Sequence, residues 1–272
     1  MRLRHHGLPG SLLVLIAVAT FSTAACGGGS EAEKSSADGV APAAAGQKID
    51  PSSTGSVTGT VVLNGTAPAN AIIKMNADPI CLRQAKGEQF QETFKVAADG
   101  KSLGNVFVYV KDGLGNYVYD SPAGAVTLNQ EGCHYIPHVF GIRVGQPLEI
   151  LNSDPTLHNI HAVPKINQEF NNGQPMQGMK TSHTFTAQEV MVPFKCDVHG
   201  WMNAYAGVLD HPFFAVTDDE GKFEISGLPP GTYTVEAWHE RLGAVTQSVT
   251  IAAKESKELS FTLEASAAAA TN

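Results

Sequence analysis

The sequence predicts an all-β protein. From about residue 56 onward the chain consists mainly of short runs in which apolar and polar residues alternate, and no long stretch has helical periodicity. Turn-forming pairs such as Asn64-Gly65 and Glu220-Gly221 separate neighbouring runs. We expect strands at residues 57–63, 106–110, 125–128, 139–144, 147–151, 190–194, 223–225 and 233–238. Short strands at this spacing are typical of a β-sandwich or barrel.

The first residues have the features of an export signal. Arg2 and Arg4 form a short basic head, residues 11–21 are almost continuously apolar, and small residues precede Cys26. The apolar run is too short to span a bilayer comfortably, so we predict a cleaved signal at residues 1–25 rather than a membrane anchor.

The position of Cys26, directly after small residues, resembles the lipobox of bacterial lipoproteins, although Thr23 stands where Leu is usual. The resemblance implies that Cys26 is lipidated and that its acyl chains hold the protein on a membrane surface. The alternative is an ordinary signal peptide followed by a free Cys26. In either case the sequence predicts an exported protein, periplasmic or at the cell surface.

Composition separates the chain ends from the folded region. Residues 26–55 are mostly Gly, Ala, Ser and charged residues, which predicts a flexible tether, and residues 266–272 are expected to form a disordered tail.

The net charge of the chain is acidic. Cleavage of the predicted signal removes Arg2 and Arg4, so the 18 basic residues fall to 16 against 26 acidic ones, a net charge of −10. The chain has no basic stripe, so nucleic acid is not an expected partner.

Residues 122–210 resemble a cupredoxin, the fold of the small blue copper proteins. CHYIPHVFGIRVGQPLEILNSDPTLHNIHAV is similar to that family's aromatic-x-Pro strand, its Val-Gly turn and its Asn-x-Asp segment before a His. The turn IRVGQ lacks the two residues that usually separate the Val from the Gly. SHTFTAQEVMVPFKCDVHGWMNAYAGVL resembles the closing hairpin with its metal-binding loop. The resemblance implies a Greek-key β-sandwich or barrel.

The following segment, TDDEGKFEISGLPPGTYTVEAWHE, resembles the carboxypeptidase regulatory-like (transthyretin-like) β-sandwich. Residues 211–265 are short for such a domain. The runs VTGTVVLNG and NVFVYVKDG, within residues 56–121, look like its opening strands. We therefore expect the cupredoxin segment to be inserted into this second domain, and a simple tandem arrangement is the alternative.

Cys196, His199 and Met202 follow one another in C-x2-H-x2-M spacing on a single short loop. A thiolate, two imidazoles and a weak thioether form the ligand set of a type 1 copper site. The resemblance to amicyanin-type proteins implies that His158 supplies the second imidazole. Zinc is the chemical alternative, but it gains little from a thioether.

Two neighbours of His158 also enter the prediction. Asn159 matches the family's His-Asn pair, whose Asn ties the first ligand to the Cys loop. His161 competes with His158 for the role of ligand, although three residues along a strand it should face the opposite side.

The missing motifs predict a mononuclear centre and no enzymatic turnover. A trinuclear copper centre would need paired His-x-His motifs and a His on each side of the Cys, but the neighbours of Cys196 are Lys195 and Asp197. A CuA site would need two cysteines in the loop, and this loop has one.

We expect an electron carrier whose partner is a redox protein such as a cytochrome or a dehydrogenase. The family resemblance implies that His199 reaches the surface and forms the electron exit. The alternatives are a copper-delivery protein and a cell-surface interaction module with a structural metal.

Assigning Cys26 to lipid and Cys196 to the metal leaves Cys81 and Cys133 as the remaining pair of the four cysteines. In an oxidising compartment we expect these two to form a disulfide, and two separate buried thiols are the alternative.

Overall fold

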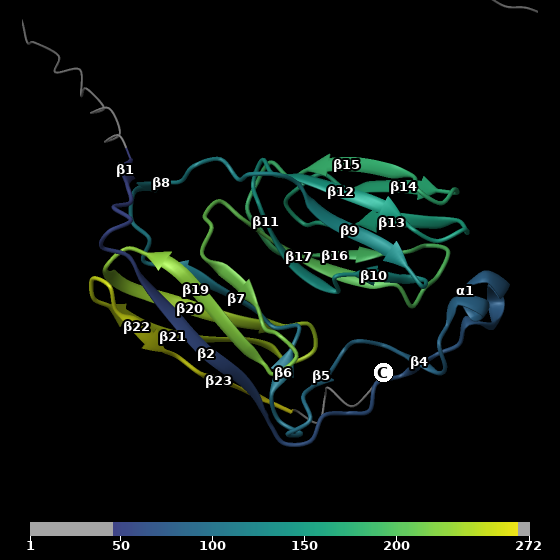
Figure 1. Cartoon of the computed structure of the whole chain (residues 1–272), viewed down its shortest axis with the longest axis horizontal. Coiled ribbons are helices and arrows are strands. Elements are labelled where there is room, and N and C mark those ends of the chain that lie inside the picture. Colours follow the sequence, from purple (N-terminus) through teal and green to yellow (C-terminus); the bar gives the residue numbers. More distant parts are fainter. Residues whose placement is uncertain (1–45, 266–272) are drawn as a thin grey trace, which may run out of the picture. The chain divides into compact units, whose positions relative to one another are not determined.

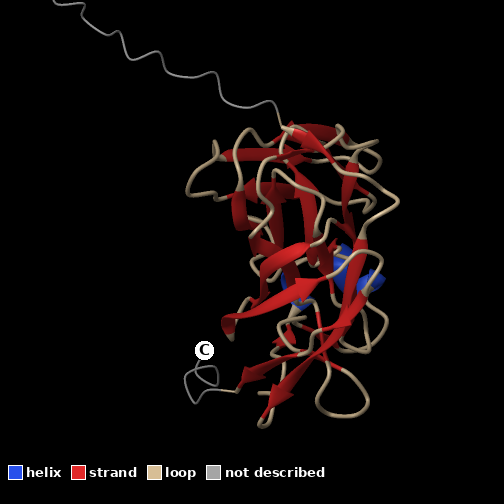
Figure 2. Ribbon diagram, turned by 90° about the vertical axis from the view of Figure 1, so that its left-hand side faces the viewer, coloured by secondary structure: helices blue, strands red, loops and turns tan. Residues whose placement is uncertain are grey.

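The computed structural model describes residues 46–265, and their secondary structure is almost entirely β (Figures 1 and 2). The prediction of an all-β protein is confirmed, and every expected strand coincides with an observed one. The strands form two sandwiches, which we call the central and the flanking sandwich.

The central sandwich is built from residues 126–209. One sheet has the order β10-β9-β12-β15 and the other the order β11-β17-β16-β13-β14. The strands are β9 (Val126–Glu131), β10 (His134–Ile136), β11 (Val139–Arg143), β12 (Pro147–Asn152), β13 (His158–Ala162), β14 (Phe170–Gln174), β15 (Lys180–Thr184), β16 (Glu189–Lys195) and β17 (Asn203–Leu209). Alternate residues such as Leu148 and Ile150 are fully buried, so each strand turns one face to the core between the sheets.

The flanking sandwich combines strands from both sides of the central one in sequence. Its sheets have the orders β18-β7-β20-β21 and β19-β2-β22, with β23 also paired to β2. The strands are β2 (Gly55–Asn64), β7 (Phe107–Asp112), β18 (Phe214–Val216), β19 (Lys222–Leu228), β20 (Gly231–His239), β21 (Gly243–Ile251), β22 (Ser256–Glu258) and β23 (Phe261–Glu264). Because β2 pairs with β19 and β7 with both β18 and β20, neither part of the chain closes this sandwich alone.

A compact excursion between β2 and β7 has no counterpart among the predicted elements. We call residues 72–90 the cap segment: it contains β3 (Ile72–Ile73), the 3-10 helix η1 (Met75–Ala77), helix α1 (Pro79–Gln84) and β4 (Gln89–Phe90). Asp78 starts α1 by accepting hydrogen bonds from the backbone amides of Ile80 and Cys81, and Pro79 fits the first turn.

Four short strands complete the described chain. β5 (Lys95–Val96) pairs with β6 (Leu103–Gly104), and β1 (Gln47–Lys48) pairs with β8 (Tyr117–Val118). The predicted tether extends to residue 55, yet residues 47–55 contain β1 and the first residue of β2, so ordered structure begins before Ser56.

The two sandwiches pack through a small apolar cluster of Phe107, Tyr109, Val139, Met191 and Leu209. Glycines permit the close approach: a Cβ on Gly207 would lie 2.2 Å from the Phe107 ring, and one on Gly141 would lie 2.1 Å from the Phe214 ring.

The predicted signal peptide, Cys26, most of the tether and the C-terminal tail lie outside the described residues. Among the residues that are described, no helix is long and apolar enough to cross a membrane.

Candidate metal centre

Strand pairing brings the predicted ligands to one end of the central sandwich. β16 ends at Lys195 and β17 begins at Asn203, and these two residues are paired, so the loop between them closes a hairpin. β13 runs antiparallel to β16 with His161 opposite Lys195. The first residue of β13, His158, therefore lies at the same end of the sheet as the loop that contains Cys196 and His199.

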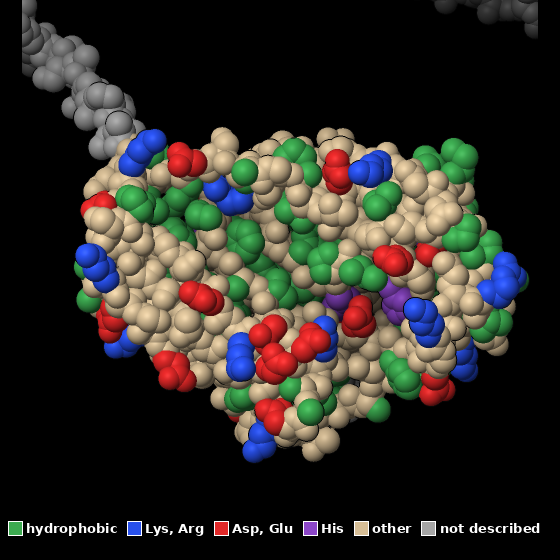
Figure 3. All heavy atoms as spheres, viewed as in Figure 1, with side chains coloured by type: hydrophobic (Ala, Val, Ile, Leu, Met, Phe, Trp, Pro, Cys, Tyr) green, Lys and Arg blue, Asp and Glu red, His purple; other side chains and the backbone are tan. Residues whose placement is uncertain are grey.

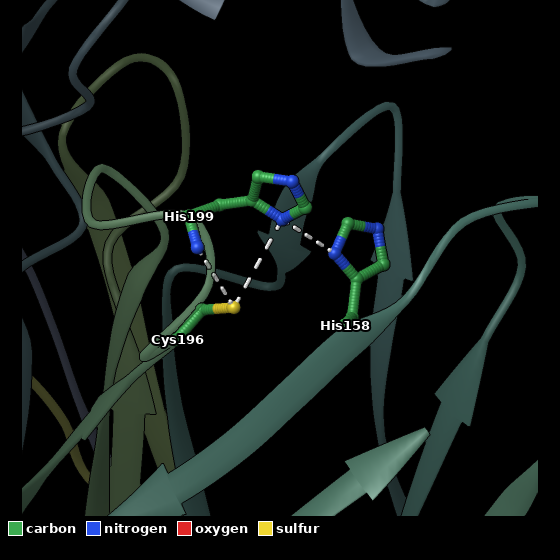
Figure 4. Close-up of side chains that lie close together, drawn as sticks. All are labelled: His158, Cys196 and His199. Carbon is green, nitrogen blue, oxygen red and sulfur yellow. Dashed lines mark hydrogen bonds between the residues drawn. The ribbon is translucent and has the colours of Figure 1, made fainter. Parts of the chain in front are cut away.

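The side chains of His158, Cys196 and His199 converge (Figure 4). The two Nδ1 atoms are 3.0 Å apart, and the Cys196 sulfur is 4.0 Å from Nδ1 of His199. None of the three residues is more than 3% exposed. The structure thus brings together, in a buried position, three donors separated in sequence by up to 41 residues.

A carboxylate contacts the Nε2 atom of each imidazole and so fixes the orientation of the ring. Nε2 of His158 lies 2.8 Å from Asp154, and Nε2 of His199 lies 3.0 Å from Asp78. A carboxylate accepts a hydrogen bond, so it favours the tautomer with the proton on Nε2. Both Nδ1 atoms then present lone pairs to the same point, beside a cysteine sulfur.

The same arrangement favours the thiolate form of Cys196. Burial opposes ionisation of the thiol. When the rings of His158 and His199 carry a proton on Nδ1, their hydrogen bonds, together with those of the His199 and Asn159 backbone, outweigh burial and lower the pKa of Cys196 to about 5. A thiolate is the form of cysteine that binds metals.

Two further predicted residues lie around these donors. Met202 is buried in the same apolar cluster as Cys196, and its carbonyl accepts a hydrogen bond of 3.1 Å from the Cys196 amide. Asn159 accepts a 2.7 Å hydrogen bond from the amide of Asp197, which joins β13 to the loop. Both residues therefore help to fix the shape of the loop between β16 and β17, which contains Cys196 and His199.

The donor set fits a single metal ion. Donors that share one ion at about 2.0–2.3 Å can be at most about 4–4.5 Å apart, and the observed separations of 3.0 and 4.0 Å meet that limit. Two imidazoles, a thiolate and a nearby thioether residue form a soft set that suits copper. Without a cation or a shared proton, two lone pairs and a thiolate at this distance would repel one another.

The expectation that His199 reaches the surface is wrong. His199 is 3% exposed because the cap segment covers it. Asp78 binds its Nε2, and the sulfur of Cys81 lies 3.6 Å from the same atom. The resemblance to a cupredoxin is confined to residues 122–210. It could not predict that residues 72–90, the cap segment, cover His199.

Cys81 and Cys133 form a disulfide with a Cα–Cα distance of 5.6 Å. It joins α1 to the turn between β9 and β10. The turn itself is anchored to the site, because the amides of Gly132 and Cys133 donate to Asp154, the carboxylate that holds His158.

His161 does not join the three donors. Its side chain lies between Glu169, at 2.6 Å, and Asp197, at 2.9 Å. It therefore points away from His158, as the strand periodicity predicts. His138 and His239 lie elsewhere, near the flanking sandwich, where His138 contacts Glu240 at 2.6 Å.

Three residues that shape the site were not among the predicted site residues: Asp78, Asp154 and Trp201. The indole of Trp201 donates to the Cys133 carbonyl and its ring centroid lies 5.0 Å from that of His199. The Asp78-Pro79 pair is a recognisable helix start, and Asp154 belongs to the Asn-x-Asp segment. Neither signal tells which distant histidine the carboxylate meets.

The comparisons with known proteins agree with parts of this description. Residues 208–264 match the family model of the carboxypeptidase regulatory-like domain, which confirms that part of the predicted resemblance. No curated protein matches the chain significantly.

Solved structures that are similar to the chain include an amicyanin, a purple cupredoxin and a copper-containing nitrite reductase. The M98A mutant of amicyanin in the Cu(I) form is 22% identical, with 33% of this chain and 86% of that chain covered and a TM-score of 0.28. A purple cupredoxin from Nitrosopumilus maritimus is 20% identical, covering 30% and 98% respectively, with a TM-score of 0.27. A copper-containing nitrite reductase from Thermus scotoductus is 21% identical. The match covers 35% of this chain and 24% of that chain, with a TM-score of 0.27.

Proposed function

We propose that this chain is an exported type 1 copper protein that transfers single electrons between redox partners and is held on a membrane by lipid at Cys26. One observation carries the proposal: two histidines with their Nε2 atoms occupied by carboxylates direct both Nδ1 atoms at one point beside Cys196. His158, Cys196, His199 and Met202 would hold one copper ion, which supplies a one-electron couple. Substrate turnover is not part of the proposal.

The protein's own contribution is to keep the ligands still. The hydrogen bonds of Asp154 and Asp78 fix both imidazole rings, and Asn159 fixes the loop at Asp197. A site whose ligands are held in place changes little between oxidation states, so an electron moves with a small reorganisation energy. The burial of all three donors excludes water, which would otherwise be an additional ligand.

The experiment that tests the function separates electron transfer from copper delivery. The copper-loaded protein is reduced and reoxidised by stopped-flow with a one-electron reagent, and the retention of copper is then measured against a competing Cu(I) chelator. The proposal expects fast, reversible cycling with copper retained through many turnovers. Slow cycling with ready transfer of copper to the chelator would instead support a delivery protein.

A further inference from the structure

We propose that the outer face of the cap segment is the docking surface for an acidic redox protein. The inference rests on the proposed electron-transfer function and adds the partner's chemistry and the place of contact. In each encounter this protein would lose one electron and the partner's oxidised centre would gain it, with no bond made or broken.

The cap segment lies between the ligand His199 and the surface. Cys81 on α1 is 3.6 Å from Nε2 of His199, and Asp78 at the start of α1 is bonded to that atom. The next residue after Cys81, Leu82, is 54% exposed. Only the side chain of Cys81 therefore separates the His199 ring from the backbone of α1. A partner bound to the outer face of α1 would come close to His199 without entering the site.

The outer face of the cap segment exposes large apolar side chains. Ile72 and Phe90 are 53% and 46% exposed and face each other as a cross-strand pair of β3 and β4. Ile72 and Leu82 line a groove of about 260 Å³ on this face. An apolar centre in a polar surround is the usual anatomy of a protein interface.

The charge around this groove selects the partner. Lys74, Arg83 and Lys86 are exposed, and none of them forms an ion pair within the described part of the chain, while Glu88 is the one acidic side chain that lines the groove. In Figure 3, Lys and Arg side chains lie beside hydrophobic ones at the right, where Figure 1 places α1. The chain as a whole carries a net charge of −8, so this basic patch is a local exception. Because salt screens charges beyond about 10 Å, the patch would attract an acidic surface at close range.

A second exposed apolar pair offers a rival contact. Leu157 and Val198 precede the two histidine ligands and are 43% and 47% exposed. The charges beside this pair are acidic on balance: Asp197, next to Val198, and Glu169 lie on either side of His161, and Lys195, 3.2 Å from Asp197, is the cation beside them. A partner at this second patch would therefore be basic, so the sign of the partner's charge distinguishes the two surfaces.

The binding test uses a small redox-inert anion as the probe. Hexacyanochromate(III) is titrated into the ¹⁵N-labelled, Zn²⁺-loaded protein, and the paramagnetic broadening of each amide is measured. The proposal expects broadening at residues 72–90, and its loss in a K74E/R83E/K86E variant. A K165E/K222E/K254E variant, which changes three exposed lysines elsewhere, serves as the matched control. Broadening that ignores the cap segment would overturn the proposal.

The kinetic test uses an acidic c-type cytochrome as the oxidant of the reduced copper protein. The K74E/R83E/K86E change should lower the second-order rate constant about tenfold at low salt, and L82S should lower it at every salt concentration. A rate that instead depends on V198S, or that is faster with a basic cytochrome, would overturn the proposal. Failure of the electron-transfer function would appear separately, as the absence of redox cycling in all variants, while the zinc-protein titration still reports on docking.

Discussion

At the scale of single residues, Asp78 links two parts of the molecule through its two oxygens. Oδ1 accepts the amides of Ile80 and Cys81 and so starts α1. Oδ2 accepts from Thr156 and meets His199. Although burial opposes its ionisation, the hydrogen bonds from Ile80, His199, Thr156 and Cys81 lower the pKa of Asp78 to about 2. The carboxylate is therefore charged at any working pH.

Replacing this charge should shift the redox equilibrium of the bound copper. In Asp78→Asn the amide oxygen can still cap α1, but His199 loses an anionic partner that stabilises the more positive oxidised site. We expect the reduction potential to rise by about 60 mV, a tenfold change in the one-electron equilibrium. A spectroelectrochemical titration measures it. Asp99→Asn, which changes another Asp that accepts backbone amides, is the control and should leave the potential unchanged.

His239 gives the flanking sandwich a sensitivity to acid. Its Nδ1 accepts the amides of Arg241 and Leu242, and its side chain is almost completely buried. Burial lowers the pKa of His239 from 6.5 to about 4. The unfolded chain therefore binds a proton more readily than the folded one, and stability is lost as the pH falls from about 6.5 toward 4.

The variant His239→Asn tests this account, because its side-chain oxygen can accept the same two amides without titrating. We expect the free energy of unfolding to decrease from about pH 7 to about pH 4.5. This decrease should be about 2 kcal/mol smaller in the variant than in the wild type. Urea unfolding at both pH values measures it. An identical fall in both proteins would show that His239 does not carry the effect.

At the scale of elements, the cap segment depends on its disulfide. Helix α1 has six residues and would be marginal on its own. The Cys81–Cys133 bond ties it to the turn between β9 and β10, 52 residues away in sequence. The disulfide, together with the contacts of Asp78 with His199 and Thr156, therefore holds α1 over His199.

Removing the bond should open the site. In a Cys81→Ala/Cys133→Ala variant we expect a loss of about 2–4 kcal/mol in stability and removal of copper by a chelator that is about tenfold faster, because the cap opens locally. Chelation kinetics measure the rate. A protein that is equally destabilised elsewhere, with the disulfide intact, should release copper at the wild-type rate. Unchanged chelation in the double variant would mean that the cap does not guard the ligands.

The same elements show which features the sequence could predict. The C-x2-H-x2-M spacing is local, so the amino-acid order alone places Cys196, His199 and Met202 on one hairpin loop. Alternation reveals strands such as β2 and β20 for the same reason. The contact of Asp78 with His199 joins residues 121 apart, and no local pattern in residues 72–90 indicates what the segment covers.

At the scale of the whole molecule, the two sandwiches pack closely at a glycine that leaves room for an aromatic ring. Phe107 on β7 packs onto Gly207 on β17, so the first part of the flanking sandwich contacts the last strand of the central one. Strands from both sides of the central sandwich must also pair with each other before the flanking one is complete. The flanking sandwich is therefore complete only when the parts of the chain before and after the central sandwich have come together.

A methyl group at this contact should be costly. In Gly207→Ala the new Cβ would lie 2.2–2.7 Å from three atoms of the Phe107 ring, which must move. Overpacking of this kind costs about 1–3 kcal/mol, which urea denaturation measures. Gly173→Ala, where a Cβ meets nothing within 4 Å, is the control and should be close to wild type. Equal stabilities of the two variants would argue against close packing of the sandwiches.

The proposed function depends above all on His158, Cys196, His199 and Met202 forming one type 1 copper site. The most direct measurement is the visible and EPR spectrum of the purified protein after addition of Cu(II). We expect one copper per chain, an intense charge-transfer band from the Cys196 thiolate and a narrow copper hyperfine splitting, and we expect Cys196→Ser to remove the band and the narrow splitting. A colourless protein that takes up Zn²⁺ in preference to copper, or a spectrum unchanged by Cys196→Ser, would contradict it.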